Sequence, residues 1–99
     1  MVKHIVLFKL KETLSQEEKM EVMNQFKAAI ESLPEKIDFI RQVFVGLNCN
    51  PSEKWDICLE STFDTLDDVK AYAIHPAHVA AASVIKEAKA DRSCVDFEF

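Results

Sequence analysis

The chain has 99 residues, 48% of them hydrophobic, which fits a single domain spanning residues 1–99. Its formal net charge is −5, from 17 acidic and 12 basic residues, and the basic residues form no cluster. We therefore expect no nucleic-acid partner and no anionic membrane partner, because both require clustered positive charge. The longest apolar run, Ile5 to Phe8, is too short for a membrane span or a signal peptide, so we expect a cytoplasmic protein.

The first third of the chain predicts a strand followed by a helix. Residues Val2 to Leu10 are rich in β-branched and aromatic side chains, which favours a strand. Ser15 followed by Glu18 forms a capping-box pattern at the start of a helix. Apolar residues then recur every three or four positions, so we expect the helix to run from Gln16 to Leu33 and to stop at Pro34.

Three further segments have the composition of strands. We predict a second strand over Phe39 to Val45, ended by Gly46, the only glycine in the chain. Trp55 to Phe63 alternates apolar and polar residues and predicts a third strand. Ser93 to Phe99 alternates in the same way and predicts the last strand.

A broken helix is expected between the third and fourth strands. Asp64 or Thr65 can cap its start, because both side chains accept hydrogen bonds from the first free backbone amides. Pro76 interrupts it, since proline is tolerated only at a helix start, and the helix should resume as Ala77 to Lys89.

The resulting β-α-β-β-α-β order predicts an α+β, ferredoxin-like subunit with two helices on one face of a four-stranded antiparallel sheet. The first strand is apolar on both sides at its centre, with Val6 and Phe8 on one side and Ile5 and Leu7 on the other. The helices can cover only one side. We therefore expect a homodimer in which the uncovered sheet faces pack together as a dimeric α+β barrel.

The stretch YAIHPAHV, residues 72–79, contains the candidate catalytic residues Tyr72 and His78. A histidine is suited to remove a proton next to a carbonyl group, because its pKa begins near neutral pH. A phenol can stabilise the enolate that forms. The two residues are six positions apart across a proline, so their convergence depends on the kink. In the alternative interpretation, Tyr72 packs in the core and His78 faces solvent in the first turn of the resumed helix.

The sequence predicts neither a metal site nor a cofactor. His75, His78 and His4 could supply three imidazoles, yet no carboxylate or cysteine lies at ligand spacing beside the His75–His78 pair. The three cysteines include no C-x-x-C pair, and we interpret them as reduced thiols. A single glycine cannot form a phosphate-binding loop, so we expect no nucleotide cofactor. The extended conformation favoured before proline is a simpler explanation of His75.

Several stretches resemble the stress-responsive A/B barrel domain (Dabb) family, a branch of the dimeric α+β barrel superfamily. The most specific are KHIVLFK at residues 3–9 and the Y-x-x-H-P-x-H pattern at residues 72–78, supported by WDICLESTFDTLDDVKAY at 55–72 and VDFEF at 95–99. The resemblance implies a ferredoxin-like subunit, a homodimer, and in each subunit a small pocket between the sheet and the second helical region.

The resemblance also implies roles for single residues. The site motif is similar to that of plant polyketide cyclases of this family, in which His78 would be the base, Tyr72 the partner of a carbonyl oxygen and His4 a pocket-lining residue. We include His75 with His4 as a candidate ligand-binding residue. The expected function is binding of an apolar carbonyl or phenolic molecule, with a cofactor-free proton transfer or aldol-type step. The alternative is a dimeric stress-response or binding module without catalysis.

Overall fold

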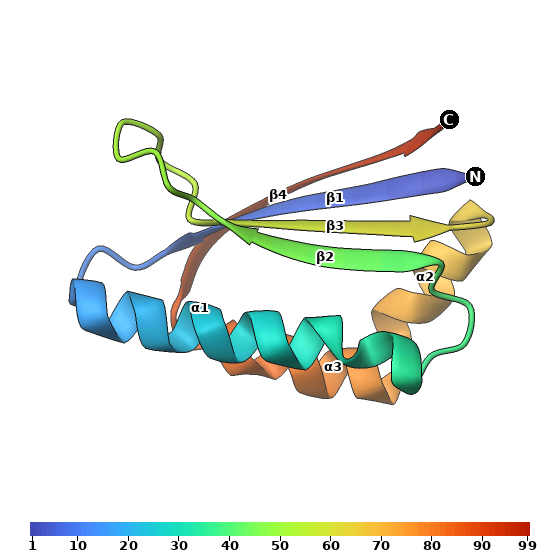
Figure 1. The fold of residues 1–99 in the computed structure, drawn as a ribbon, viewed down its shortest axis with the longest axis horizontal. Coiled ribbons are helices and arrows are strands. Elements are labelled where there is room, and N and C mark those ends of the chain that lie inside the picture. Colours follow the sequence, from blue (N-terminus) through green and yellow to red (C-terminus); the bar gives the residue numbers. More distant parts are fainter.

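Four strands form one antiparallel sheet in the order β2-β3-β1-β4 in the computed structural model, which describes residues 1–99 (Figure 1). This is the strand order of the ferredoxin-like fold, and it confirms the β-α-β-β-α-β organisation expected from the sequence. The strands are β1 (Val2–Leu10), β2 (Gln42–Leu47), β3 (Ile57–Phe63) and β4 (Lys89–Glu98).

The helices cover one face of this sheet. Figure 1 shows α1 and α3 side by side beneath the strands, with α2 at the end of the sheet where the amino terminus lies. No helix is both long enough and apolar enough to cross a bilayer. The helices are α1 (Gln16–Glu31), α2 (Leu66–Ile74) and α3 (Pro76–Ala82), with short 3-10 turns η1 (Leu33–Glu35) and η2 (Ser83–Ile85).

The start of α1 confirms the predicted capping box. The Glu18 amide donates to the Ser15 hydroxyl oxygen at 3.1 Å, and the Ser15 amide donates to the Glu18 carboxylate at 2.8 Å. The helix ends at Glu31, slightly earlier than predicted, because Ser32 closes it and Pro34 lies within the 3-10 turn η1.

The predicted bounds of the second strand were wrong. Gly46 was expected to end a strand over Phe39 to Val45, but β2 runs from Gln42 to Leu47 and includes Gly46. Gly46 has no positive φ and pairs with Cys58 of β3, so its backbone continues the ladder instead of turning.

The predicted end of the last helix was also wrong. A helix over Ala77 to Lys89 was expected, but α3 ends at Ala82, and β4 begins at Lys89, four residues before the predicted start at Ser93. Lys89 pairs with Leu10 at the end of β1, and the Lys11 amide donates to the Ala88 carbonyl at 2.8 Å. Strand pairing therefore outweighs the helical propensity of this stretch.

The two faces of the sheet differ in what covers them. The face toward the helices carries alternate residues of β1, namely Val2, Val6, Phe8 and Leu10, which join a core of 18 buried apolar residues. The opposite face has no covering layer, and we call it the open face. Its apolar side chains are Ile5 and Leu7, partly buried, and Phe44, Val95 and Phe97, which are exposed.

Candidate functional site

His4 lies on β1 and faces the helices, with only 9% of its surface exposed. Its neighbour across the ladder is Asp96 of β4, and Nδ1 of His4 lies 2.5 Å from the Asp96 carboxylate. A carboxylate accepts hydrogen bonds, so Nδ1 carries the proton in this pair.

The chain between α2 and α3 turns at His75 and Pro76. The hydroxyl of Thr65 caps the start of α2, accepting from the Asp68 amide at 3.1 Å, which selects Thr65 over Asp64. His75 has φ −64° and ψ 132°, the extended conformation expected before a proline. Its Nδ1 accepts from the Ala77 amide at 3.0 Å, so the His75 ring caps the start of α3.

This kink brings together the two residues that the sequence left six positions apart. The ring centroids of Tyr72 and His78 are 4.2 Å apart, with an interplanar angle of 46°. The His4 ring approaches Tyr72 from the sheet, with centroids 6.2 Å apart and an angle of 75°. Residues from β1, α2 and α3 thus meet at one point under the sheet.

The environment of His78 keeps its imidazole neutral and defines its tautomer. Burial lowers the pKa of His78 below its ordinary value, opposed by the hydrogen bond to the Ala73 carbonyl. That carbonyl lies 3.2 Å from Nδ1, and because it can only accept, Nδ1 carries the proton. Nε2 of His78 therefore bears the lone pair, as a general base requires.

Tyr72 is the most constrained side chain of the site. It is 1% exposed, and burial strongly raises the pKa of its phenol, so the hydroxyl stays protonated. The hydroxyl oxygen is buried and has no hydrogen-bond partner within the protein. Leaving such a group unpaired costs about 1–3 kcal/mol, and Tyr72 lines a cavity, so its hydroxyl can donate to a group that enters there.

The three side chains line a cavity of about 250 Å³. Most of its wall is apolar, and its remaining polar groups are the cations Lys89 and Arg92 at the start of β4. His75 does not line the cavity, because its ring is turned to the amide of Ala77. The apolar and small lining residues are Val6, Phe8, Phe26, Ile30, Leu59, Ala73, Ala82 and Ile85.

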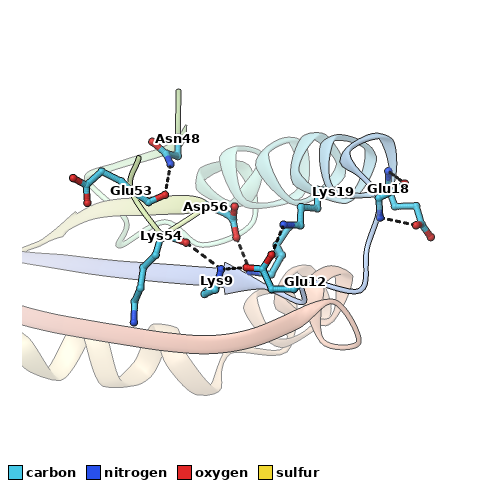
Figure 2. A network of polar contacts seen from close by, with 10 residues as sticks. Lys9, Glu12, Glu18, Lys19, Asn48, Glu53, Lys54 and Asp56 are labelled. Carbon is cyan, nitrogen blue, oxygen red and sulfur yellow. Dashed lines mark hydrogen bonds and ion pairs between the residues drawn. The ribbon is translucent and has the colours of Figure 1, made fainter. Parts of the chain in front are cut away.

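A larger groove of about 690 Å³ lies between α1 and the loop after β2. Figure 2 shows that its charged groups contact one another: Glu12 pairs with Lys9 and, at 3.8 Å, with Lys19. Asp56 accepts from the Leu10 amide at 2.7 Å. None of the histidines or Tyr72 lines this groove, so it contains none of the predicted chemistry.

Sequence reasoning missed Asp96 as the partner of His4, and the cations Lys89 and Arg92 at the cavity. The 92 positions between His4 and Asp96 leave no local motif, and only the β1–β4 register places them opposite each other. The sole signal was alternation in the last strand, where Asp96 shares a side with Cys94.

Comparison with known proteins places this geometry among relatives of the same fold. A structure from Bacteroides fragilis, described as a dimeric protein of unknown function with a ferredoxin-like fold, has TM-score 0.97 at 61% identity, over 99% of this chain and 95% of that chain. Hydroxynitrile lyase from Passiflora edulis has TM-score 0.76 at 21% identity, over 97% of this chain and 90% of that chain, a likeness of fold alone.

Olivetolic acid cyclase of Cannabis sativa is 26% identical over 88 residues, which make up 86% of this chain and 83% of the cyclase. The family model described as Stress responsive A/B Barrel Domain matches residues 2–99, nearly the whole chain. The fold and the match agree with the resemblance carried by residues 3–9 and 72–78. The chain therefore belongs to the stress-responsive A/B barrel domain (Dabb) family.

Proposed function

We propose that the chain binds a small, mostly apolar carbonyl or phenolic molecule in the cavity between His4, Tyr72 and His78. We further propose that it removes a proton beside the carbonyl group, as in the first step of an aldol-type reaction. The observation that carries this proposal is the buried, unpaired hydroxyl of Tyr72, whose ring centroid lies 4.2 Å from that of a neutral histidine. The name of one relative, olivetolic acid cyclase, denotes a ring-closing reaction, which an intramolecular aldol-type step would be.

In the proposed reaction, His78 is the base. Its Nε2 takes a proton from the carbon next to the carbonyl, the C–H electron pair moves into the new C=C bond, and the carbonyl oxygen becomes an enolate oxygen. Tyr72 donates a hydrogen bond to that oxygen as negative charge develops on it. The enolate carbon can then attack a second carbonyl of the same molecule, and the His78 imidazolium returns its proton to the new alkoxide.

The cavity restricts the size and polarity of the ligand. Its volume of about 250 Å³ is below the range of about 300–1,000 Å³ usual for small-molecule sites. The apolar wall favours a hydrocarbon body, while Lys89 and Arg92 favour an acidic end such as a carboxylate or a phenolate. We therefore propose a compact acidic carbonyl compound as the ligand class and no cofactor in the reaction.

We also propose that two chains pair through the open face as a homodimer. Phe44, Val95 and Phe97 are 52%, 54% and 45% exposed, and several large apolar residues exposed on one face indicate an interaction surface. The relative from Bacteroides fragilis is described as dimeric. In the dimer, the two open faces would cover each other and leave one cavity on the outer side of each sheet.

The catalytic proposal is tested most directly by measuring proton removal, because this measurement does not require the product to be known. The wild-type protein is incubated in D₂O with a panel of small β-diketones and β-keto acids, and NMR follows deuterium entering the carbon between the carbonyl groups. We expect exchange above the buffer rate, reduced in His78→Gln and in Tyr72→Phe. Cys49→Ser, an exposed cysteine outside the cavity, is the matched control and should exchange like wild type.

The outcomes separate the proposed enzyme from a binding module. Exchange that survives in His78→Gln would exclude His78 as the base. Ligand-induced shifts of the Tyr72 and His78 resonances without exchange would support the non-catalytic alternative, in which the same cavity only binds. The control variant shows whether any loss of exchange arises from the site itself.

A further inference from the structure

We propose that His4, Cys94 and Asp96 form a zinc-binding site at the edge of the sheet. The three ligand atoms are Nδ1 of His4, the sulfur of Cys94 and a carboxylate oxygen of Asp96, and all lie within 4.8 Å of one another. This site differs from the His75–His78 pair that the sequence raised and set aside. It also goes beyond the proposed function, in which His4 only lines the cavity.

The β1–β4 ladder assembles these ligands. Cys94 and Asp96 are two positions apart on β4, so their side chains leave the same side of the strand. Cys94 lies opposite Val6, and Asp96 lies opposite His4, on the face turned toward the helices. β4 is the last strand of the sheet, and both of its ligands are exposed while His4 is buried. A metal ion can therefore enter from the solvent side.

One pair of ligand atoms already has the spacing of a tetrahedral zinc centre. Bonds of about 2.0 Å to nitrogen or oxygen and about 2.3 Å to sulfur require ligand atoms about 3.2–3.6 Å apart. The Cys94 sulfur lies 3.6 Å from Nδ1 of His4, which already satisfies this requirement. Asp96 is closer, at 2.5 Å from the same nitrogen, because Nδ1 donates a hydrogen bond to its carboxylate. The metal would replace that proton, and the side chain of Asp96, 32% exposed, has room to move outward.

Charge also favours a divalent, thiophilic ion. A thiolate and a carboxylate neutralise the charge of Zn²⁺, and a neutral imidazole completes a mixed S, N, O set that zinc accepts and magnesium or calcium does not. Three protein ligands leave one position open. Zinc binds the thiolate form of cysteine, so the metal must displace the thiol proton of Cys94.

The test uses Co²⁺ as a spectroscopic probe of the metal-free, reduced protein. A cobalt–thiolate bond produces a charge-transfer band in the near ultraviolet, which reports sulfur coordination directly. We expect this band to saturate at one Co²⁺ per chain and to disappear when Zn²⁺ is added. Cys94→Ser should abolish the band. Asp96→Asn should weaken zinc binding at least tenfold, measured in competition with a chromophoric chelator. Tenfold is the lower end of the loss in metal affinity seen when residues that support metal ligands are changed.

Two controls make the result decisive. Cys49→Ser removes another exposed cysteine and should keep the full band. Cys94 and Asp96 are exposed on an edge strand, so both variants should keep the wild-type circular dichroism spectrum, which separates loss of a ligand from loss of the fold. A folded wild-type protein without the band, or a band retained in Cys94→Ser, would overturn the zinc site. Neither result depends on the carbonyl ligand, so the proposed reaction stands or fails independently.

Discussion

Tyr72→Phe should make the protein more stable and less active. The substitution keeps the ring that packs against Phe63, at a centroid distance of 5.0 Å, and removes only the hydroxyl. That oxygen is buried without a hydrogen-bond partner, and such a group costs about 1–3 kcal/mol of folding free energy. Part of this gain is lost with the contacts of the oxygen itself. We expect the free energy of unfolding to rise by about 1 kcal/mol, or about 4–8 °C in Tm.

The same substitution should impair proton removal. A hydrogen bond to a charged oxygen is worth about 1.5–3 kcal/mol, so without the Tyr72 hydroxyl the enolate loses more stabilisation than the neutral ligand. The expected decrease in the exchange rate is about 10–100-fold, with a smaller decrease in ligand affinity.

Urea unfolding and the deuterium-exchange assay measure these opposite effects on the same samples. Both proteins must be compared at one concentration, because the stability of a dimer depends on it. A Tyr72→Phe variant less stable than wild type would refute the reasoning, since it would show that the hydroxyl is satisfied in the free protein. A more stable variant with normal exchange would remove Tyr72 from the reaction.

Three other predictions concern the surroundings of the site. Burial lowers the pKa of His78, so the unfolded chain binds more protons than the folded chain as pH falls through the ordinary histidine range. The free energy of unfolding should therefore decrease with acid in this range, and His78→Gln should flatten the decrease in urea titrations at several pH values. His75→Ala should cost about 1 kcal/mol by removing the cap of α3, and His75→Asn should restore most of it in the same assay. Lost ligand binding in His75→Asn would instead support the predicted contact of His75 with the ligand. Phe97→Glu should give a monomer by light scattering, and a dimer that persists would place the interface elsewhere.

The sequence predicted the fold well where a local pattern determines the structure. The capping box of Ser15 and Glu18 and the strand over Val2 to Leu10 each follow from neighbouring residues, and both appear in the structure. The boundaries of β2 and of the last helix were wrong because cross-strand hydrogen bonds decide them. Gly46 and Lys89 become strand residues through their partners Cys58 and Leu10, which no local pattern identifies.

In the candidate site, too, local features could be predicted from the sequence and long-range contacts could not. Tyr72 and His78 could be selected from the sequence, and the extended conformation of His75 follows from Pro76. How close Tyr72 and His78 lie could not be predicted, because a shift of the kink by two residues would rotate His78 by about 200°, to the other side of α3. The pairing of His4 with Asp96 depends on the register of two strands at opposite ends of the chain.

The break between α2 and α3 gives the cavity two parts that can evolve separately. The proposed catalytic pair, Tyr72 and His78, is positioned by the end of α2 and the kink. Ala82, at the far end of α3, and Ile85, in η2, form part of the cavity wall. A larger or smaller side chain at these two positions changes the shape of the cavity and leaves the ring pair in place. Substitutions at Ala82 and Ile85 can thus change the ligand while leaving the proposed catalytic pair intact.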